Sequence, residues 1–482
     1  MFLRWKVEAR HRHDTPLHPF TPSPTFALSS ADLLNASATE GYQTISNEIR
    51  LIGESGRLQW LVGGFYAQEE VDAFTRLEFG VDTGRYLCGL FTANTVASCF
   101  NATGFQPASI TTSFIGDNNF NPNLVIAGEG SEGIFDVSSR SWSVFAQGTW
   151  ALTDRFSATL GLRYIDDHKE GTGDNTVDNT VALTDNNSLP PFLGLVNDFT
   201  AEVDDTALTG TFNVQYEFTP DLMVYASYSR GYKAGGINLD RTSATVVTPL
   251  TGAQPVADPT FDPEFSDNYE VGMKSQWFNN SLGLNLTAFN TEFEDLQILS
   301  FTGLAFIVET MPSARTRGVE LESYWEPVED LVFTAGVTYA DTEYGSGSLL
   351  TQSLPNPPIN LTGLHFTNAP VWSGSLGMAY SWDLTSNLEG YFNINGFYGS
   401  DRSTSSAQGP DKEQEAYELI NFRMGLAHAA GWDLALWCRN CGDTEYYQVL
   451  FNSVYQNSAT SPNVDGYIGD RREIGLTLSV DF

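Results

Sequence analysis

The chain of 482 residues carries 59 acidic side chains against 24 Lys and Arg, so its formal net charge is −35. This balance excludes nucleic acid as a partner, because no basic surface could neutralise the phosphates. Aromatic residues make up 13% of the chain and glycines number 43, a composition typical of strands and turns. No apolar run reaches the roughly 18 residues of a membrane-spanning helix. Mean hydropathy is −0.20, a value that a transmembrane β-barrel shares with soluble proteins because alternate strand residues face a polar interior.

Residues 1–41 are predicted to be a leader or loop. Residues 1–13 are basic but lack the apolar stretch of a signal peptide. If the chain is exported, its natural start is therefore expected to be missing. The segment that follows is rich in Pro and His and shows little alternation.

Residues 42–482 are predicted to form strands, because apolar and polar side chains alternate with a period of two. The pattern is clear at residues 156–164 and 331–339, and it continues through residues 474–482 to Phe482. The polar face of this last segment holds Gly, Ser, Thr and Asp rather than Lys and Glu. This composition favours a barrel in a membrane over a soluble sandwich.

The connections between these strands alternate between short and long, as periplasmic turns and outer loops do in such barrels. The short turns are predicted at residues 53–57, 151–154, 218–221, 279–280, 326–330 and 429–431. The long connections are predicted at residues 81–137, 169–202, 234–263, 344–369, 400–414 and 453–469. About 15 antiparallel strands follow from this spacing, an odd number for a barrel that should close with an even one.

The four cysteines fall into two local pairs, which fits an oxidising compartment. A disulfide is expected between Cys88 and Cys99. For Cys438 and Cys441 both a disulfide and a zinc site stay open, although no His lies at zinc-finger spacing.

Several motifs in order resemble the TonB-dependent receptor family. The segment NEIRL at residues 47–51 resembles the family's QELRL strand, and YSRGYKAGGIN at residues 228–238 resembles its signature. Further matches are Pro263 and Glu264 with the strand YEVGMK at residues 269–274, RGVE at residues 317–320, and WCRNCGDTEY at residues 437–446. In the last of these, Cys441 and Gly442 replace two apolar residues of the family pattern.

The resemblance implies an all-β fold: an antiparallel meander barrel in the outer membrane, in which the visible strands match the last part of a barrel of about 22. It also implies energy-coupled uptake of a scarce nutrient, most often a ferric siderophore-type chelate, by a Gram-negative cell. The implied partners are outer-membrane lipid and lipopolysaccharide, the TonB energy-coupling protein, the chelate, and the barrel-assembly machinery that reads Phe482. The family's plug and TonB box have no counterpart here, so a passive porin-like channel and a non-functional receptor fragment remain alternatives.

The candidate site residues come from these motifs. Near the outer end of a strand, Arg230, Tyr232 and Lys233 could contact ligand or plug. The simpler interpretation is salt bridging in the lumen, with Gly231, Gly235 and Gly236 setting a bend, and the residue types favour it. Ion pairs in the lumen are likewise expected for Glu270 and Glu320, with Lys274 and Arg317 as partners. The remaining family-motif candidates are Asn440, Asp443 and Phe482.

No catalytic or cofactor motif is present, so neither an enzyme nor a cofactor or metal requirement is expected. The acidic clusters at residues 166–167, 174–187 and 258–267 lack the spacing of a calcium loop. They are interpreted as solvated outer loops.

Overall fold

The computed structural model describes residues 2–9, 15–16, 34–79, 100–101, 104–105, 130–178, 198–239, 258–301, 306–351, 358–452 and 464–481. Within these ranges the chain is almost entirely β-structure, with one short 3-10 helix, η3 (Pro410–Lys412). No helix among them is both long and apolar enough to cross a membrane.

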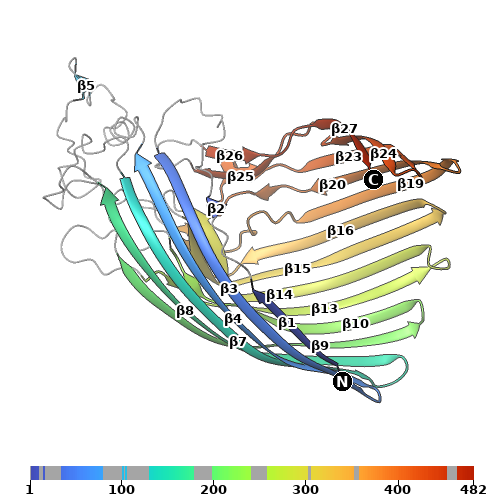
Figure 1. The fold of residues 1–482 in the computed structure, drawn as a ribbon, viewed down its shortest axis with the longest axis horizontal. Helices are drawn as coiled ribbons and strands as arrows, with labels where there is room; N and C mark the ends of the chain where they lie inside the picture. The colour runs from blue at the N-terminus through green and yellow to red at the C-terminus, as the bar shows by residue number, and fades with distance from the viewer. Residues whose placement is uncertain are drawn as a thin grey trace.

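One antiparallel sheet organises the chain, and Figure 1 shows it as a curved wall. The sheet contains 17 strands, of which β1 and β2 pair one after the other along the same edge of β3, so 15 strands form the meander. This number and the antiparallel meander confirm the predicted fold. The meander strands are β3 (Leu34–Ser55), β4 (Leu58–Phe79), β7 (Gly130–Ala151), β8 (Phe156–Asp178), β9 (Phe199–Thr219), β10 (Leu222–Lys233), β13 (Glu264–Trp277), β14 (Leu282–Phe301), β15 (Phe306–Val328), β16 (Leu331–Tyr344), β19 (Trp372–Thr385), β20 (Leu388–Gly399), β23 (Tyr417–His428), β24 (Trp432–Arg439) and β27 (Glu473–Val480).

The first residues are more ordered into strands than the sequence predicts. Strands β1 (Phe2–Ala9) and β2 (Thr15–Pro16) pair with β3, which itself begins at Leu34. These strands were not predicted, because apolar and polar residues alternate only weakly in this segment. Strand pairing needs only backbone groups and not an apolar face. The division of the chain into residues 1–41 and 42–482 stays a prediction.

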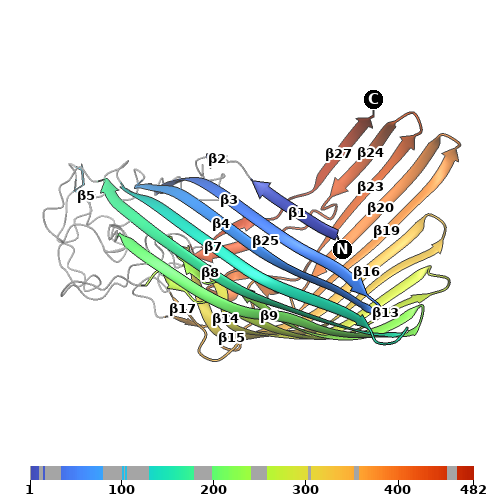
Figure 2. The ribbon, with the colours of Figure 1, turned by 60° about the horizontal axis from the view of Figure 1, so that its bottom comes forward.

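The wall is open along two edges in the described part of the chain. Strand β27 pairs with β24, and the opposite end of the meander is β3 with β1 and β2 beside it. Figure 2 shows the resulting trough, in which β1 and β27 lie on opposite rims.

One face of the wall, called the outer face here, exposes apolar side chains from strand to strand. Leu160 and Leu162 on β8 are 54% and 51% exposed, and Ile474 and Leu476 on β27 are 67% and 69% exposed. Leucine, isoleucine, valine or aromatic side chains are exposed on most strands of the meander and together make an apolar surface, which a protein in water would bury. This surface is suited to lipid, as predicted for residues 474–482.

The short turns gather at one end of the wall, on the right in Figure 1. All six predicted turns join neighbouring strands there, and a seventh between Thr385 and Leu388 was not predicted. At the other end the strands reach further than expected, because β7 begins at Gly130, β8 continues to Asp178 and β9 begins at Phe199. The predicted connections at residues 81–137 and 169–202 are therefore partly strand, and Asp166, Asp167 and Asp174 lie on β8 rather than in a loop.

Five short strand pairs of the described residues lie at the end of the wall opposite the short turns. They are β5 (Phe100–Asn101) with β6 (Gly104–Phe105), β11 (Gly236–Ile237) with β12 (Thr260–Phe261), β17 (Leu349–Leu350) with β18 (Ile359–Asn360), β21 (Arg402–Ser403) with β22 (Glu413–Gln414), and β25 (Tyr447–Asn452) with β26 (Val464–Ile468).

Two small apolar cores lie at this end, where wall strands meet the segments that fold over them. One is built around Met311, Tyr344 and Leu361, and the other around Phe135 and Phe199. Burial in water-facing regions stabilises these cores by the hydrophobic effect, whereas the lipid-facing strands depend on backbone pairing.

Candidate functional site

The signature segment leaves the wall at the end of β10 and folds back over the neighbouring strands. We call residues 234–239 the fold-back segment. The backbone N–H of Gly235 donates to Asp205 Oδ2 on β9 at 2.8 Å. On β8, the ammonium of Lys169 donates to the Gly235 carbonyl at 2.5 Å. Both backbone groups of this glycine are thus held by charged side chains from two adjacent strands.

Apolar contacts hold the same segment against the inner face of the wall, opposite the outer face. Ile237 and Leu239 pack on the small core formed by Phe135, Phe199 and Ala201. These core residues occupy alternate, buried positions of β7 and β9, where the neighbouring positions are exposed. The fold-back segment therefore covers the inner face at the end opposite the short turns.

Further hydrogen bonds connect the fold-back segment to β14 and β15. Gln297 Nε2 donates to the carbonyl oxygens of Ala234 and Asp262, both at 3.0 Å. Asn238 Nδ2 donates to the Val308 carbonyl at 3.0 Å, and the Val308 N–H donates to Asn238 Oδ1 at 2.7 Å. The segment consequently bridges strands that are far apart in the meander.

Gly235 allows a close backbone approach in this arrangement. A Cβ atom at this position would lie 2.6 Å from the Phe261 carbonyl oxygen and 2.9 Å from Asp205 Oδ2. Only glycine fits such a contact without displacing backbone. Gly236 likewise faces the Phe261 ring, and Gly231 faces Ser266.

The three polar residues of the signature lie at the point where β10 departs from β9. Arg230 pairs with Asp267 at 2.6 Å and Glu294 at 3.4 Å, and its guanidinium lies 4.9 Å from the Phe265 ring centroid. The hydroxyl of Tyr232 donates to Asp167 Oδ2 at 2.9 Å, across β9. Lys233 ends the strand and is exposed.

Arg230 does not face the lumen, contrary to the sequence interpretation. Side chains alternate along β10, and Arg230 shares its face with Tyr228, whose ring lies 5.2 Å from that of the outward, 51% exposed Tyr269. Which residues of β10 face outward could not be predicted without the register of β10 against β13. A role of Arg230 as a ligand or plug contact stays a prediction.

Burial shifts the pKa values of the groups beneath the fold-back segment, which lie beyond the apolar part of the wall. Burial lowers the pKa of the Lys169 ammonium, although Asp167 and Asp205 oppose this shift. Burial also raises the pKa of Asp205, while the hydrogen bond from Gly235 acts in the opposite direction. Burial, aided by the hydrogen bond to Asp167, raises the pKa of Tyr232. Each group is thus held in a polar, partly dehydrated layer between segment and wall.

The family described as TonB dependent receptor-like, beta-barrel matches residues 6–441, nine-tenths of the chain. The chain belongs to the TonB-dependent receptor family. Together with the apolar outer face, this membership assigns it to the outer membrane of a Gram-negative bacterium.

Three similar proteins illustrate the likeness. The metal-pseudopaline receptor CntO of Pseudomonas aeruginosa (strain UCBPP-PA14) is 23% identical over 293 residues, which are 60% of this chain and 36% of CntO. The ferric-pyoverdine M114 receptor PbuA of Pseudomonas sp. (strain M114) is 21% identical over 300 residues, 59% of this chain and 30% of PbuA. The structure of the ferric yersiniabactin uptake receptor FyuA from Yersinia pestis superposes with a TM-score of 0.65 at 15% identity, covering 94% of this chain and 56% of FyuA.

The chain therefore spans about a third of these curated relatives and about half of the solved receptor. All three relatives are named as receptors, and none is named as an enzyme. The likeness in structure supports the barrel fold.

Two acidic residues of the TonB-dependent receptor motifs lie on the inner face. Glu270 accepts a hydrogen bond from the hydroxyl of Tyr225, which also contacts Thr287 at 3.1 Å. Glu320 is the register partner of Thr287. The predicted ion pair between Glu320 and Arg317 is wrong, because three positions along a strand place them on opposite faces, and Arg317 pairs with Asp341 at 2.9 Å.

Asn440 and Asp443 organise the turn after β24. Asn440 is buried, and its amide donates to the carbonyls of Thr444 and Asp470, both at 2.8 Å, while accepting from Thr444 N–H at 2.9 Å. Asp443 accepts from the Arg472 N–H at 3.1 Å. These contacts join the turn to the chain that leads into β27.

Cys438 and Cys441 form a disulfide, with Cα atoms 5.6 Å apart. Of the two alternatives left open by their spacing, a disulfide or a zinc site, the structure has the disulfide. Cys88, Cys99 and Phe482 lie outside the described residues.

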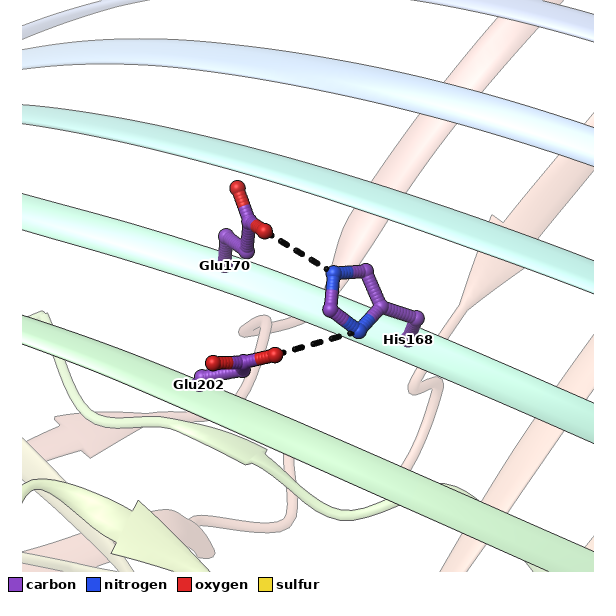
Figure 3. Close-up of side chains that lie close together, drawn as sticks. All are labelled: His168, Glu170 and Glu202. Atoms are coloured by element: carbon purple, nitrogen blue, oxygen red, sulfur yellow. Dashed lines mark hydrogen bonds and ion pairs between the residues drawn. The ribbon is translucent and has the colours of Figure 1, made fainter.

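One group of side chains was not singled out from the sequence. His168, Glu170 and Glu202 lie together on β8 and β9, on the outer face (Figure 3). Two of them fall within residues 169–202, which were predicted as a loop, and only strand pairing shows that they meet. The available signal was a run of five consecutive titratable residues at positions 166–170.

Proposed function

We propose that this chain is the barrel wall of an outer-membrane receptor that takes up a metal chelate of the ferric siderophore type, with energy supplied through TonB. The observation that carries the proposal is the family match over residues 6–441, combined with the signature segment folded onto the inner face. The names of the relatives support the ligand class, since they mention metal-pseudopaline, ferric-pyoverdine and ferric yersiniabactin.

The fold-back segment would serve this function as a rigidly held stretch of backbone at the outer opening of the barrel. It is tied to β8 and β9 by Lys169 and Asp205, and to β14 and β15 by Gln297 and Asn238. Rigid backbone at the mouth can position outer loops for ligand capture, because binding sites on firmly held elements lose less entropy on binding. Lipid, lipopolysaccharide and the barrel-assembly machinery, the last through Phe482, are further partners of the proposed receptor.

The test is an uptake assay in a Gram-negative host that lacks its own siderophore receptors. The gene, with any in-frame sequence upstream of Met1, is expressed in strains with and without TonB. Cells are given radioactive iron as ferric yersiniabactin or ferric pyoverdine. We expect accumulation of at least one chelate in the strain with TonB and background levels in the strain without it.

Two outcomes would contradict the proposal. Equal accumulation in both strains would indicate a passive, porin-like channel. Surface expression of the folded barrel without accumulation of either chelate would overturn the assigned ligand class.

A further inference from the structure

On the outer face of β7, β8 and β9, the side chains change from mainly apolar to mainly polar beyond an aromatic pair. The rings of Trp142 and Tyr164 lie 5.6 Å apart, at the upper limit of the exposed leucines of β8. Aromatic side chains of this kind typically occupy the interface between lipid and water. The strands continue past this row, so the next outward side chains of β8 stand above the apolar layer. They are Asp166, His168 and Glu170.

His168 lies between carboxylates on both sides of its ring, as Figure 3 shows. Nε2 lies 3.0 Å from Glu170 Oε1, and Nδ1 lies 2.7 Å from Asp204 Oδ1 and 3.7 Å from Glu202 Oε1. One ligand atom each from His168, Glu170 and Glu202 falls within 4.8 Å of the others. The histidine side chain is 21% exposed, and the three carboxylates are between 61% and 73% exposed.

Strand pairing fixes this arrangement. His168 is the register partner of Asp204, and Glu170 is the partner of Glu202. Because side chains directly opposite in an antiparallel pair have Cβ atoms about 5 Å apart, the four groups converge without help from a loop. The backbone positions are therefore set before any ligand binds.

The charge of the group is not balanced by the cations around it. Three carboxylates face one imidazole, with Asp166 on β8 adjoining them and Arg140 on β7 as the register partner of His168. Even a protonated imidazole leaves negative charge in the group.

We propose that His168, Glu170 and Glu202 bind a divalent cation of the zinc class on the outer face of the barrel, with Asp204 as the positioning residue. Imidazole nitrogen and carboxylate oxygen together are zinc ligands, whereas calcium and magnesium need six or more oxygen ligands. Nε2 would ligate the ion beside Glu170, and Nδ1–H would donate to Asp204, the usual arrangement of an orienting carboxylate. Glu202 lies nearer Nδ1, and its side chain would turn toward its register partner Glu170 to complete the site. Such an ion would fasten β8 to β9 above the lipid, whatever chelate the barrel takes up.

The experiment is a zinc titration by calorimetry of the 482-residue chain folded in detergent micelles, in mildly alkaline, chelator-free buffer. We expect a saturable one-to-one binding step that is lost in His168→Ala and in Glu202→Gln. The matched controls are His428→Ala and Glu389→Gln, at the short-turn end of the wall, which should keep the step. Asp204→Asn should weaken it by about 10- to 100-fold.

The heat-dependent mobility of the barrel on gels shows whether each variant is folded. If a variant does not fold, the wild-type chain still tests the proposal, because cobalt should replace zinc with visible absorption bands and magnesium should not compete. Zinc binding that is unchanged in folded His168→Ala, or equal competition by magnesium, would overturn the proposal. The group would then be an imidazolium held between carboxylates. None of these results depends on uptake of a chelate.

Discussion

Asn238 pairs with Val308 through both ends of its side-chain amide, as a second strand would pair through its backbone. The amide supplies one donor and one acceptor to a residue 70 positions further along the chain. By this contact the fold-back segment is joined to β15, while its other end is held by β8 and β9. The fold-back segment thus reaches from β8 and β9 to β15 at the end of the wall opposite the short turns.

Replacing Asn238 by Ala should loosen the fold-back segment without unfolding the barrel. Both backbone groups of Val308 would lose their partner, and each such loss costs about 1–3 kcal/mol when water cannot replace it. Hydrogen exchange followed by mass spectrometry should show faster exchange in peptides that contain residues 234–239 and Val308.

Asn387→Ala is the matched control, because Asn387 makes its hydrogen bonds through its backbone at a short turn. If Asn238→Ala left exchange at Val308 unchanged, the amide pairing would not be what holds the segment.

Gly235→Ala should displace the same segment for a steric reason. The new Cβ would lie 2.6 Å from the Phe261 carbonyl oxygen, so the backbone must move and the contacts of Lys169 and Asp205 must lengthen. Overpacking of this kind typically costs about 1–3 kcal/mol. Limited proteolysis should cleave the variant faster near residues 234–239.

Gly283→Ala on β14 separates this effect from the general effect of adding a methyl group, since no heavy atom lies within 4 Å of its Cβ position. Equal cleavage rates for the two alanine variants would show that the close approach at Gly235 is unimportant.

The wall could be predicted from the sequence where one face is apolar. Residues 156–164, 331–339 and 474–480 alternate clearly, and each lies on a strand with exposed apolar side chains. Residues 166–176 of β8 are all polar or glycine, so residues 169–178 show no apolar period and were predicted as loop. Backbone pairing with β7 and β9 continues there regardless of side-chain polarity.

The contacts of the candidate residues were less accessible to prediction than their positions. The partners of Arg230 depend on the register between β10 and β13, which follow each other across a long connection. A shift of one residue would have turned Arg230 to the inner face. The meeting of His168 with Glu202 has the same origin, since it requires the register of β8 against β9 across residues 179–198.

A double-mutant cycle should show that the Arg230–Asp267 pair contributes little to stability. The side chains are 32% and 21% exposed, and pairs in such positions are typically worth less than about 1 kcal/mol. Arg230→Met keeps much of the contact with Phe265, and Asp267→Asn keeps the shape of the acid. Unfolding by guanidinium in lipid vesicles, followed by tryptophan fluorescence, measures the coupling. A coupling well above that value would indicate a buried, dry pair.

Asn440 should matter more, because it is 4% exposed and its side chain makes three hydrogen bonds within the turn after β24. Asn440→Ala leaves two carbonyl groups and one N–H without their partner, so we expect a loss on the order of 2–3 kcal/mol. The same unfolding assay measures it, with Glu445→Gln as control. Glu445 lies in the same turn, but its ion pair with Arg471 is exposed, and its loss should change stability by less than about 0.5 kcal/mol.

Asn440→Gly separates the side chain from the backbone at this position. Asn440 has a φ of 43°, a conformation that glycine adopts freely and alanine does not. If the hydrogen bonds dominate, the glycine variant should be nearly as unstable as the alanine variant, because both lack the amide. A glycine variant as stable as the wild type would instead assign the effect of Asn440→Ala to backbone strain alone, and the hydrogen bonds to Thr444 and Asp470 would then contribute nothing measurable to the barrel.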